Sequence, residues 1–464
     1  MKAAERALGP TGAFGLVTPS SWQGRLLLLW IHLAACCLSL VYVARYYGYT
    51  GAAAFVQAQL PTATLLVLLL AAVAILLARA RFSFGYFVGF YLYTLVAGYT
   101  WLGVFSKFPY DRALPLASAI ASIVAFLVPV LFITRPVKQH VVLSDDATKK
   151  LRLAILTIAA TTIVAGAFYN FRLAGISAIY DFRNALDFPA PLRYAIGITS
   201  NALLPFAFAS FIMSGERVKA AIALLLLLAF YPITLTKLTL FAPFWLLFLA
   251  VVARELEPRA AIVLSLLLPI SLGLLLIIPY SLGAIPYEFF IKYFSAVNFR
   301  MIAFPSIALD VYNDFFSTHQ VTHFCQILVI KTFLGCSYDD PLSVLMSKNY
   351  ELGNLNASLF ATEGIASVGP LAAPVAAAAC GLIISLGNRA SAGLPPRFIM
   401  LSGGLLSQVL LNVPLATTLL SNGALLIFVL WYVTPRPRLT ATAQGSRPVE
   451  ASQCHRHGAA CITF

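Results

Sequence analysis

Two carboxylates with helical spacing are the first candidates for chemistry in this chain. Asp310 and Asp314 lie four residues apart, so a helix would place them on one face. Paired carboxylates serve as a general base or bind a divalent cation, but they also form the polar face of a surface helix. His319 and Glu363 follow, and each of the four side chains is a candidate for accepting a proton from a hydroxyl group. For Glu363 a second role stays open, because a carboxylate where a helix begins also stabilises the helix N-terminus.

A set of basic residues forms the second group of candidates. Arginine's planar guanidinium suits bidentate binding of a phosphate, and a lysine between apolar runs must either reach the membrane interface or meet an anion. Lys237 and Arg300 each stand among apolar neighbours. Three further arginines share one short segment with two aspartates, so local ion pairs are the alternative to phosphate binding there. The candidates for binding a phosphate or diphosphate are Arg172, Arg183, Arg193, Lys237 and Arg300.

Several signatures of other chemistries are absent from the sequence. There is no Walker A motif, no G-x-G-x-x-G dinucleotide loop and no H-E-x-x-H metalloprotease motif. His319 and His323 are four residues apart but have no evident third ligand, so no metal is expected. The sequence therefore predicts no cofactor, and the energy for any reaction must come from the substrate or from an ion gradient.

These residues belong to a chain that is too apolar for a soluble fold. Of its 464 residues, 60% are hydrophobic and 10% are charged, whereas soluble domains carry about 25% charged residues. Ionisable side chains are costly inside a membrane, which is why they mark functional sites there. The composition predicts an all-α polytopic integral membrane protein.

Apolar stretches of about 20 residues, the length that crosses a bilayer as helix, divide the chain into spans. We expect about 12 transmembrane helices, within a range of about 10 to 13. The predicted spans are 25–44, 61–78, 84–105, 113–134, 153–170, 194–213, 218–234, 238–253, 260–280, 364–386, 398–413 and 415–433.

The basic excess has a simple explanation in such a protein. Lys and Arg number 31 against 17 Asp and Glu, which gives a net charge of +14. In a soluble protein this excess would indicate nucleic acid, but in a membrane protein it reflects topology or the binding of anionic lipids and substrates. If the N-terminus is cytoplasmic and the spans alternate, most of the basic residues fall on the cytoplasmic side. We therefore expect both termini in the cytoplasm and no nucleic-acid partner.

One long segment separates the ninth and tenth predicted spans. Residues 281–362 are expected as an extracytoplasmic loop, rich in aromatic residues. Within it, 286–297 has the pattern of a helix lying flat on the membrane surface, and Ile307, Val311 and Phe315 indicate a second short helix.

Cys325 and Cys336 share this loop. They would form a disulfide if the loop lies outside the cytoplasm, and the alternative is packing as small apolar side chains. Residues 1–440 are predicted as one transmembrane domain that includes the loop, and 441–464 as a disordered cytoplasmic tail.

Short motifs follow one another in a fixed order over about half of the chain. They are Tyr180-Asp-Phe-Arg183, Asn201-Ala-Leu-Leu-Pro205, the Thr-Leu-Thr-Lys237 turn, Asn298-Phe-Arg300, Phe304-Pro305, Asp310-Val-Tyr312-Asn-Asp-Phe-Phe316, the segment 356–363 and the small-residue helix 369–381. In this order they resemble the O-antigen polymerases, also called oligosaccharide repeat-unit polymerases. The turn at Lys237 departs from the Gly-x-Lys-Ser that is usual in that family.

That resemblance implies a glycosyltransferase at the outer face of a bacterial inner membrane. The family transfers a glycan from undecaprenyl diphosphate to the non-reducing end of another lipid-linked unit and so builds O-antigen, capsule or exopolysaccharide. It implies that Arg183, Lys237 and Arg300 contact the diphosphate, that Tyr312 contacts the glycan, and that one of the carboxylates or His319 is the base. The implied partners are the lipid-linked oligosaccharide, membrane lipid, a chain-length regulator and a flippase.

Two other functions stay open at this point. A related ligase would move a finished glycan to a different acceptor, and the sequence separates it poorly from a polymerase. A transporter or flippase of lipid-linked oligosaccharide should show repeat symmetry with broken helices at the membrane midplane. No convincing repeat is visible in the sequence, which favours a transferase.

Overall fold

The computed structural model describes residues 21–46, 53–175, 182, 186–353 and 355–436. Over these residues the chain is helical, and its β-structure amounts to one isolated bridge between Ala53 and Ser106. Within the same residues, 11 helices are long and apolar enough to cross a membrane. The predicted all-α, polytopic architecture is therefore confirmed. The predicted tail and Arg183 lie outside the described residues.

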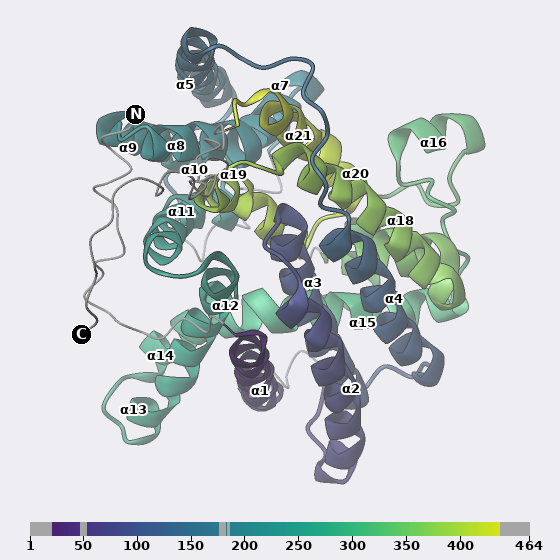
Figure 1. Cartoon of the computed structure of the whole chain (residues 1–464). Coiled ribbons are helices and arrows are strands. Elements are labelled where there is room, and N and C mark those ends of the chain that lie inside the picture. The colour runs from purple at the N-terminus through teal and green to yellow at the C-terminus, as the bar shows by residue number, and fades with distance from the viewer. Residues whose placement is uncertain (1–20, 47–52, 176–181, 183–185, 354, 437–464) are drawn as a thin grey trace, which may run out of the picture.

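The first nine predicted spans appear as helices in the expected order (Figure 1). They are α1 (Trp22–Tyr46), α2 (Leu60–Arg79) preceded by η2 (Gln57–Gln59), α3 (Phe84–Val104), α4 (Ala113–Phe132), α5 (Asp145–Tyr169), α7 (Ala190–Ile198) continued by η3 (Thr199–Leu203) and α8 (Leu204–Met213), α9 (Arg217–Ala229) with α10 (Tyr231–Thr234), α11 (Lys237–Glu255), and α12 (Pro258–Leu275) with α13 (Ile277–Ser281).

The remaining helices differ more from the expected pattern. They are α14 (Tyr287–Phe294), η4 (Ser295–Ala303), α15 (Phe304–Thr318), α16 (Leu328–Leu334), α17 (Leu342–Tyr350), η5 (Phe360–Ala366), α18 (Ser367–Ser391), α19 (Pro396–Val409), α20 (Leu415–Leu420) and α21 (Ala424–Val433). The last two predicted spans are shorter than expected, since α19 has 14 residues and α21 has 10. Gly423 separates α20 from α21 with a φ of +78°, a conformation that favours glycine.

Helix α3 is the centre of the bundle, because it is buried over its whole length. Small residues on α3 let its neighbours approach closely, as is common between membrane helices. At Gly98 the approach is closest, since a Cβ there would clash with Ser306 Oγ of α15. The hydroxyl of Ser306 in turn donates to the Leu95 carbonyl at 3.1 Å. These contacts seat α15 directly on the central helix.

Helices α14, η4 and α15 form one continuous helix of 32 residues, Tyr287–Thr318, here called the crossing helix. Its length and composition would let it span a membrane, whereas the sequence indicated a non-spanning loop with two short helices. The two helices are joined because η4 is a π-helix that precedes Pro305. The wider turn of a π-helix accommodates a proline, which lacks an N–H group and would clash within a regular α-helix.

The contacts of the crossing helix show that it runs across the bundle. Phe290 stacks on Tyr280 after α12, with ring centroids 4.7 Å apart. Asn298 Nδ2 donates to Ser39 Oγ of α1 at 2.9 Å, and Ser306 lies on α3. In Figure 1, α15 lies nearly in the plane of the picture, while α1, α11 and α12 are seen close to end-on. The helix thus touches three separate elements in turn.

The two ends of the bundle differ in chemistry. One end, here called the cystine end, holds the loop 105–112 and a disulfide between Cys325 and Cys336. The opposite end, here called the basic end, holds the end of α2, the beginning of α3 and the connection 133–144. The described chain both begins and ends there, because Arg79 lies over Trp22 and Leu143 N–H donates to the Val433 carbonyl.

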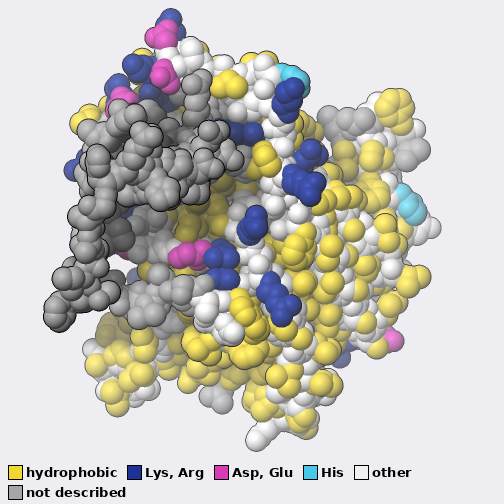
Figure 2. All heavy atoms as spheres, in the orientation of Figure 1, with side chains coloured by type: hydrophobic (Ala, Val, Ile, Leu, Met, Phe, Trp, Pro, Cys, Tyr) yellow, Lys and Arg dark blue, Asp and Glu magenta, His cyan; other side chains and the backbone are white. Residues whose placement is uncertain are grey.

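Arginines at the basic end are bonded to backbone carbonyls. Arg25 Nε donates to Ala78 O, Arg259 Nη1 to Ala80 O and Arg436 Nη1 to Val137 O, each at 3.0 Å. Basic side chains stabilise helix C-termini in this way, because the last carbonyls lack intrahelical partners. Figure 2 shows this face, with a group of Lys and Arg side chains beside a broad hydrophobic area. Part of the excess of basic residues therefore stabilises the fold by hydrogen bonds to the backbone.

Candidate functional site

Four tyrosine and aspartate side chains form a cluster at the cystine end. Helix α15 supplies Asp310 and Asp314, and Tyr110 and Tyr350 come from the loop before α4 and from the end of α17. Each aspartate accepts a hydrogen bond from one of the tyrosines. These four residues are called the carboxylate cluster below.

Asp310 is the buried member of the cluster. Only 3% of the residue is exposed, and its Oδ1 accepts a hydrogen bond from the Tyr110 hydroxyl. Tyr110 lies 3.2 Å from the Tyr99 hydroxyl, so a chain of three side chains leads into α3. Burial, together with the charge of Asp310, raises the pKa of Tyr110 well above its usual range, so the phenol stays protonated and donates.

Arg112 holds the same loop in place. Its Nη2 donates to the Ser106 carbonyl at 2.9 Å, and its guanidinium lies 5.6 Å from the centre of the Tyr110 ring. The sequence did not single out Tyr110, although a polar Tyr-Asp-Arg triplet between two apolar spans was a usable signal. Asp310, which Tyr110 positions, was among the predicted residues.

Asp314 lies one turn beyond Asp310 and is half-buried. The Tyr350 hydroxyl donates to its Oδ2 at 2.6 Å. Burial and the neighbouring carboxylate raise the pKa of Tyr350 above its usual value, so this phenol also remains a donor. The structure thus places both aspartates on one helix, as the spacing predicted, and gives each a single tyrosine partner.

Glu363 has a different environment. It is 5% exposed, its Oε1 accepts from the Ala416 backbone N–H at 3.0 Å, and its Oε2 accepts from the Thr362 hydroxyl. Both carboxylate oxygens are therefore engaged, one of them by the first turn of α20. This geometry favours a role in stabilising a helix N-terminus over a role as a base. The stabilised helix is α20, whereas the sequence indicated the helix that carries Glu363 itself.

His319 ends α15 and is exposed. Its ring stacks on Phe315 with centroids 3.9 Å apart, and its Nδ1 lies 2.9 Å from the Phe315 carbonyl. A carbonyl only accepts, so Nδ1 is the donor in this contact and Nε2 is left as the acceptor. His319 therefore keeps the capacity to accept a proton. Over the described residues, His, Cys, Asp and Glu form no group of three or more that could hold a metal ion.

Tyr312 was expected to contact a glycan. Its ring is 1% exposed, and its hydroxyl donates to the Leu355 carbonyl at 3.3 Å. In this conformation the side chain packs in the core and fastens the segment before η5 to α15. No face of the ring is open to a sugar.

A neighbouring loop is closed by a disulfide and hydrogen-bonded to η5 and α18. Cys325 and Cys336 have Cα atoms 5.1 Å apart. Thr322 N–H donates to the Ala366 carbonyl at 2.7 Å, and His323 N–H to the Ser367 carbonyl at 3.1 Å. The structure therefore contains the pairing, one of the two uses of these cysteines that the sequence left open.

Removing this disulfide is expected to destabilise the protein. A double variant, Cys325→Ser with Cys336→Ser, should lose about 2–4 kcal/mol of unfolding free energy, the usual value for a native disulfide. Reductant should lower the midpoint of thermal unfolding of the wild type and leave the double variant unchanged. Cys380→Ser, which removes a buried free cysteine, is the control. Because this variant keeps the disulfide, reductant should lower its unfolding midpoint as much as that of the wild type. Full reaction of Cys325 and Cys336 with maleimide before reduction would contradict the pairing.

The described basic candidates lie at three separate places. Arg300 lies on the crossing helix, and its guanidinium carbon is 4.0 Å from the centre of the Phe304 ring. Arg172 lies beside the segment that leads into α11, because its backbone N–H donates to the Pro232 carbonyl at 2.9 Å, and Lys237 is the first residue of α11. Arg193 is exposed on α7.

Arg300 is the basic candidate that shares an element with the carboxylate cluster. Stacking on Phe304 carries its guanidinium toward the C-terminal half of the crossing helix, which also holds Asp310. Phe304 and Asp310 are six residues apart, which is about 9 Å along a helix axis.

Comparison of the chain with protein-family models, with curated proteins and with solved structures finds no match.

Proposed function

We propose that the protein is a membrane glycosyltransferase that polymerises repeat units carried on undecaprenyl diphosphate, as O-antigen polymerases do. The single observation that carries the proposal is the crossing helix, which holds a buried, tyrosine-bonded Asp310 about 9 Å along its axis from the ring that the Arg300 guanidinium covers. The order of motifs along the chain supports the same function.

The proposed reaction needs two groups of opposite charge. The hydroxyl oxygen of the acceptor sugar attacks the anomeric carbon of the donor, and its proton passes to Asp310. The bond between that carbon and the phosphate oxygen breaks, and the diphosphate leaves with the electron pair. Arg300 neutralises the charge that grows on the leaving group, which stabilises the transition state. The bond to the diphosphate supplies the leaving group, so this reaction requires no nucleotide and no metal cofactor.

The disulfide supports an outer-face location for the site. Disulfides persist in oxidising compartments and are rare in the cytosol. The cystine end also carries the carboxylate cluster, so both would face the periplasmic side of a bacterial inner membrane. The basic end would then face the cytoplasm, in agreement with the positive-inside rule.

An assay with purified components tests the function. The purified full chain, mixed with lipid-linked repeat units and no nucleotide, is expected to yield a ladder of products that differ by one repeat unit. Transfer of a single finished glycan to a different acceptor, without a ladder, would indicate the ligase. Movement of the lipid across vesicle membranes without any new glycosidic bond would contradict the transferase altogether.

A further inference from the structure

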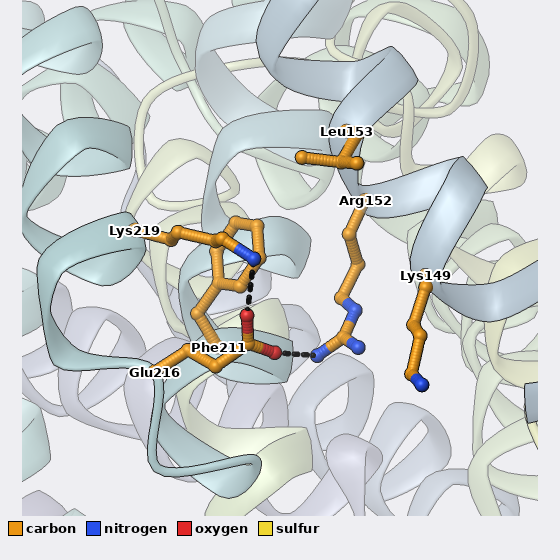
Figure 3. Close-up of a pocket in the computed structure, with 6 residues that line it drawn as sticks. All are labelled: Lys149, Arg152, Leu153, Phe211, Glu216 and Lys219. Atoms are coloured by element: carbon orange, nitrogen blue, oxygen red, sulfur yellow. Dashed lines mark hydrogen bonds and ion pairs between the residues drawn. The ribbon is translucent and has the colours of Figure 1, made fainter. Parts of the chain in front are cut away.

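A second charged site lies at the basic end, far along the chain from the carboxylate cluster. It is a pocket of about 340 Å³ between α5, α8 and α9 (Figure 3). The residues that line it are Lys149, Arg152, Leu153, Phe211, Glu216 and Lys219. The positive-inside rule accounts for basic residues at this end, but not for their convergence on one cavity.

Arg152 is the buried centre of this pocket. Only 6% of the residue is exposed. Its Nη1 lies 3.1 Å from Glu216 Oε1 and donates to Ser214 Oγ at 2.6 Å, and its guanidinium lies over the Phe211 ring. Its Nε is buried and has no hydrogen-bond partner among the described residues. A buried donor without a partner is costly, which points to a ligand acceptor that the structure does not contain.

The charges of the pocket do not balance. Glu216 is charged, because a hydrogen bond from Lys219, helped by Arg152, holds the pKa of its carboxyl below the usual value. Three cations against this one carboxylate leave an excess of two positive charges. Figure 3 shows Glu216 between Arg152 and Lys219, while Lys149 extends from α5 on the same side as Arg152. Within the part of the chain that the structure describes, Lys149 forms no ion pair.

We propose that this pocket binds the phosphate group of an anionic glycerophospholipid from the leaflet at the basic end. Arginine forms directed hydrogen bonds to phosphate oxygens, and basic pockets between helices bind anionic lipid headgroups. A lipid fits better than a soluble anion because the pocket also contains Leu153 and Phe211. Leu153 is half exposed and α5 is largely unburied, so an acyl chain can lie along this helix. The site is independent of the proposed glycosyl transfer.

Lipid titration of the purified full chain tests the proposal. The midpoint of thermal unfolding is measured in neutral detergent with increasing dioctanoyl phosphatidylglycerol, and in parallel with dioctanoyl phosphatidylcholine and with inorganic phosphate. Phosphatidylglycerol is expected to raise the midpoint, and the other two are expected to leave it unchanged. Lys149→Gln should raise the half-maximal phosphatidylglycerol concentration about fivefold, the value of one basic side chain near an anionic lipid.

Lys150→Gln is the matched control. Lys150 is the next residue on α5, carries the same charge and pairs with Asp146 at 2.8 Å outside the pocket. Arg152→Gln also removes a partner of Glu216 and Ser214, so the proposal is decided on Lys149→Gln, which leaves those contacts intact. An unchanged titration for Lys149→Gln, or an equal loss for Lys150→Gln, would overturn the proposal. Equal stabilisation by inorganic phosphate or by phosphatidylcholine would overturn the assignment to an anionic lipid.

Discussion

Asp310→Asn is expected to slow chain elongation by about 100- to 10,000-fold, the contribution that a positioned general base makes to catalysis. The amide has the size of the carboxylate and can still accept the hydrogen bond from Tyr110, so the fold should be kept. It cannot accept the proton of the acceptor hydroxyl. The measurement is the rate of ladder formation with lipid-linked repeat units, normalised to folded protein from the thermal unfolding midpoint.

Glu288→Gln is the control for this substitution. Glu288 lies in the first turn of the same crossing helix, its side chain is 84% exposed, and it makes the same change of charge. It should elongate chains at the wild-type rate. Tyr110→Phe removes the hydroxyl that positions Asp310 and should give an intermediate rate. Wild-type elongation by a folded Asp310→Asn protein would remove Asp310 from the proposed mechanism.

The spans were predictable because each depends on a single local property. A run of apolar residues of sufficient length predicts a membrane helix wherever it occurs, and α1 to α12 follow from such runs. The crossing helix escaped this reasoning. Its second half mixes Ser306, Asp310 and Asn313 with apolar residues. Ser306 and Asp310 are buried against partners that α3 and the 105–112 loop supply.

The partners of the site residues could not be predicted for a related reason. Tyr110 and Asp310 are 200 residues apart, and Glu363 and Ala416 are 53 residues apart. Helix periodicity gives the face on which a residue lies, but not which distant loop meets that face. Tyr312 shows the consequence, because the family resemblance implied a contact with the glycan and the residue is instead a buried side chain of the core.

The crossing helix shows what spacing along the chain can predict and what only packing against distant elements decides. Its spacing placed Asp310 and Asp314 on one face, as predicted, and its packing on α3 decides that Asp310 is buried while Asp314 is only half-buried. The same helix carries Arg300 into a position set by Phe304. The motifs at Arg300, Phe304 and Asp310 are thus parts of one helix. A substitution of Arg300 can therefore be compared with substitutions elsewhere on the same helix.

Arg300→Ala is expected to lower the rate of chain elongation by about 100- to 1,000-fold, the cost of removing one preorganised donor to a developing negative charge. Membrane insertion should be retained, and the thermal unfolding midpoint is measured in parallel so that a loss of folded protein is separated from a loss of rate. Arg300→Lys should recover part of the rate, since it restores the charge but not the planar group that stacks on Phe304.

Lys292→Ala separates a local role of Arg300 from a general effect of charge. Lys292 lies two turns earlier on the crossing helix, its side chain is 80% exposed, and its loss changes the net charge by the same amount. If charge alone attracts the lipid-linked substrate, both alanine variants should raise KM similarly and raising the salt concentration should mimic them. If Arg300 stabilises the departing diphosphate, its substitution lowers kcat and Lys292→Ala leaves kcat unchanged. Equal kcat for Arg300→Ala and the wild type would exclude Arg300 from the transition state.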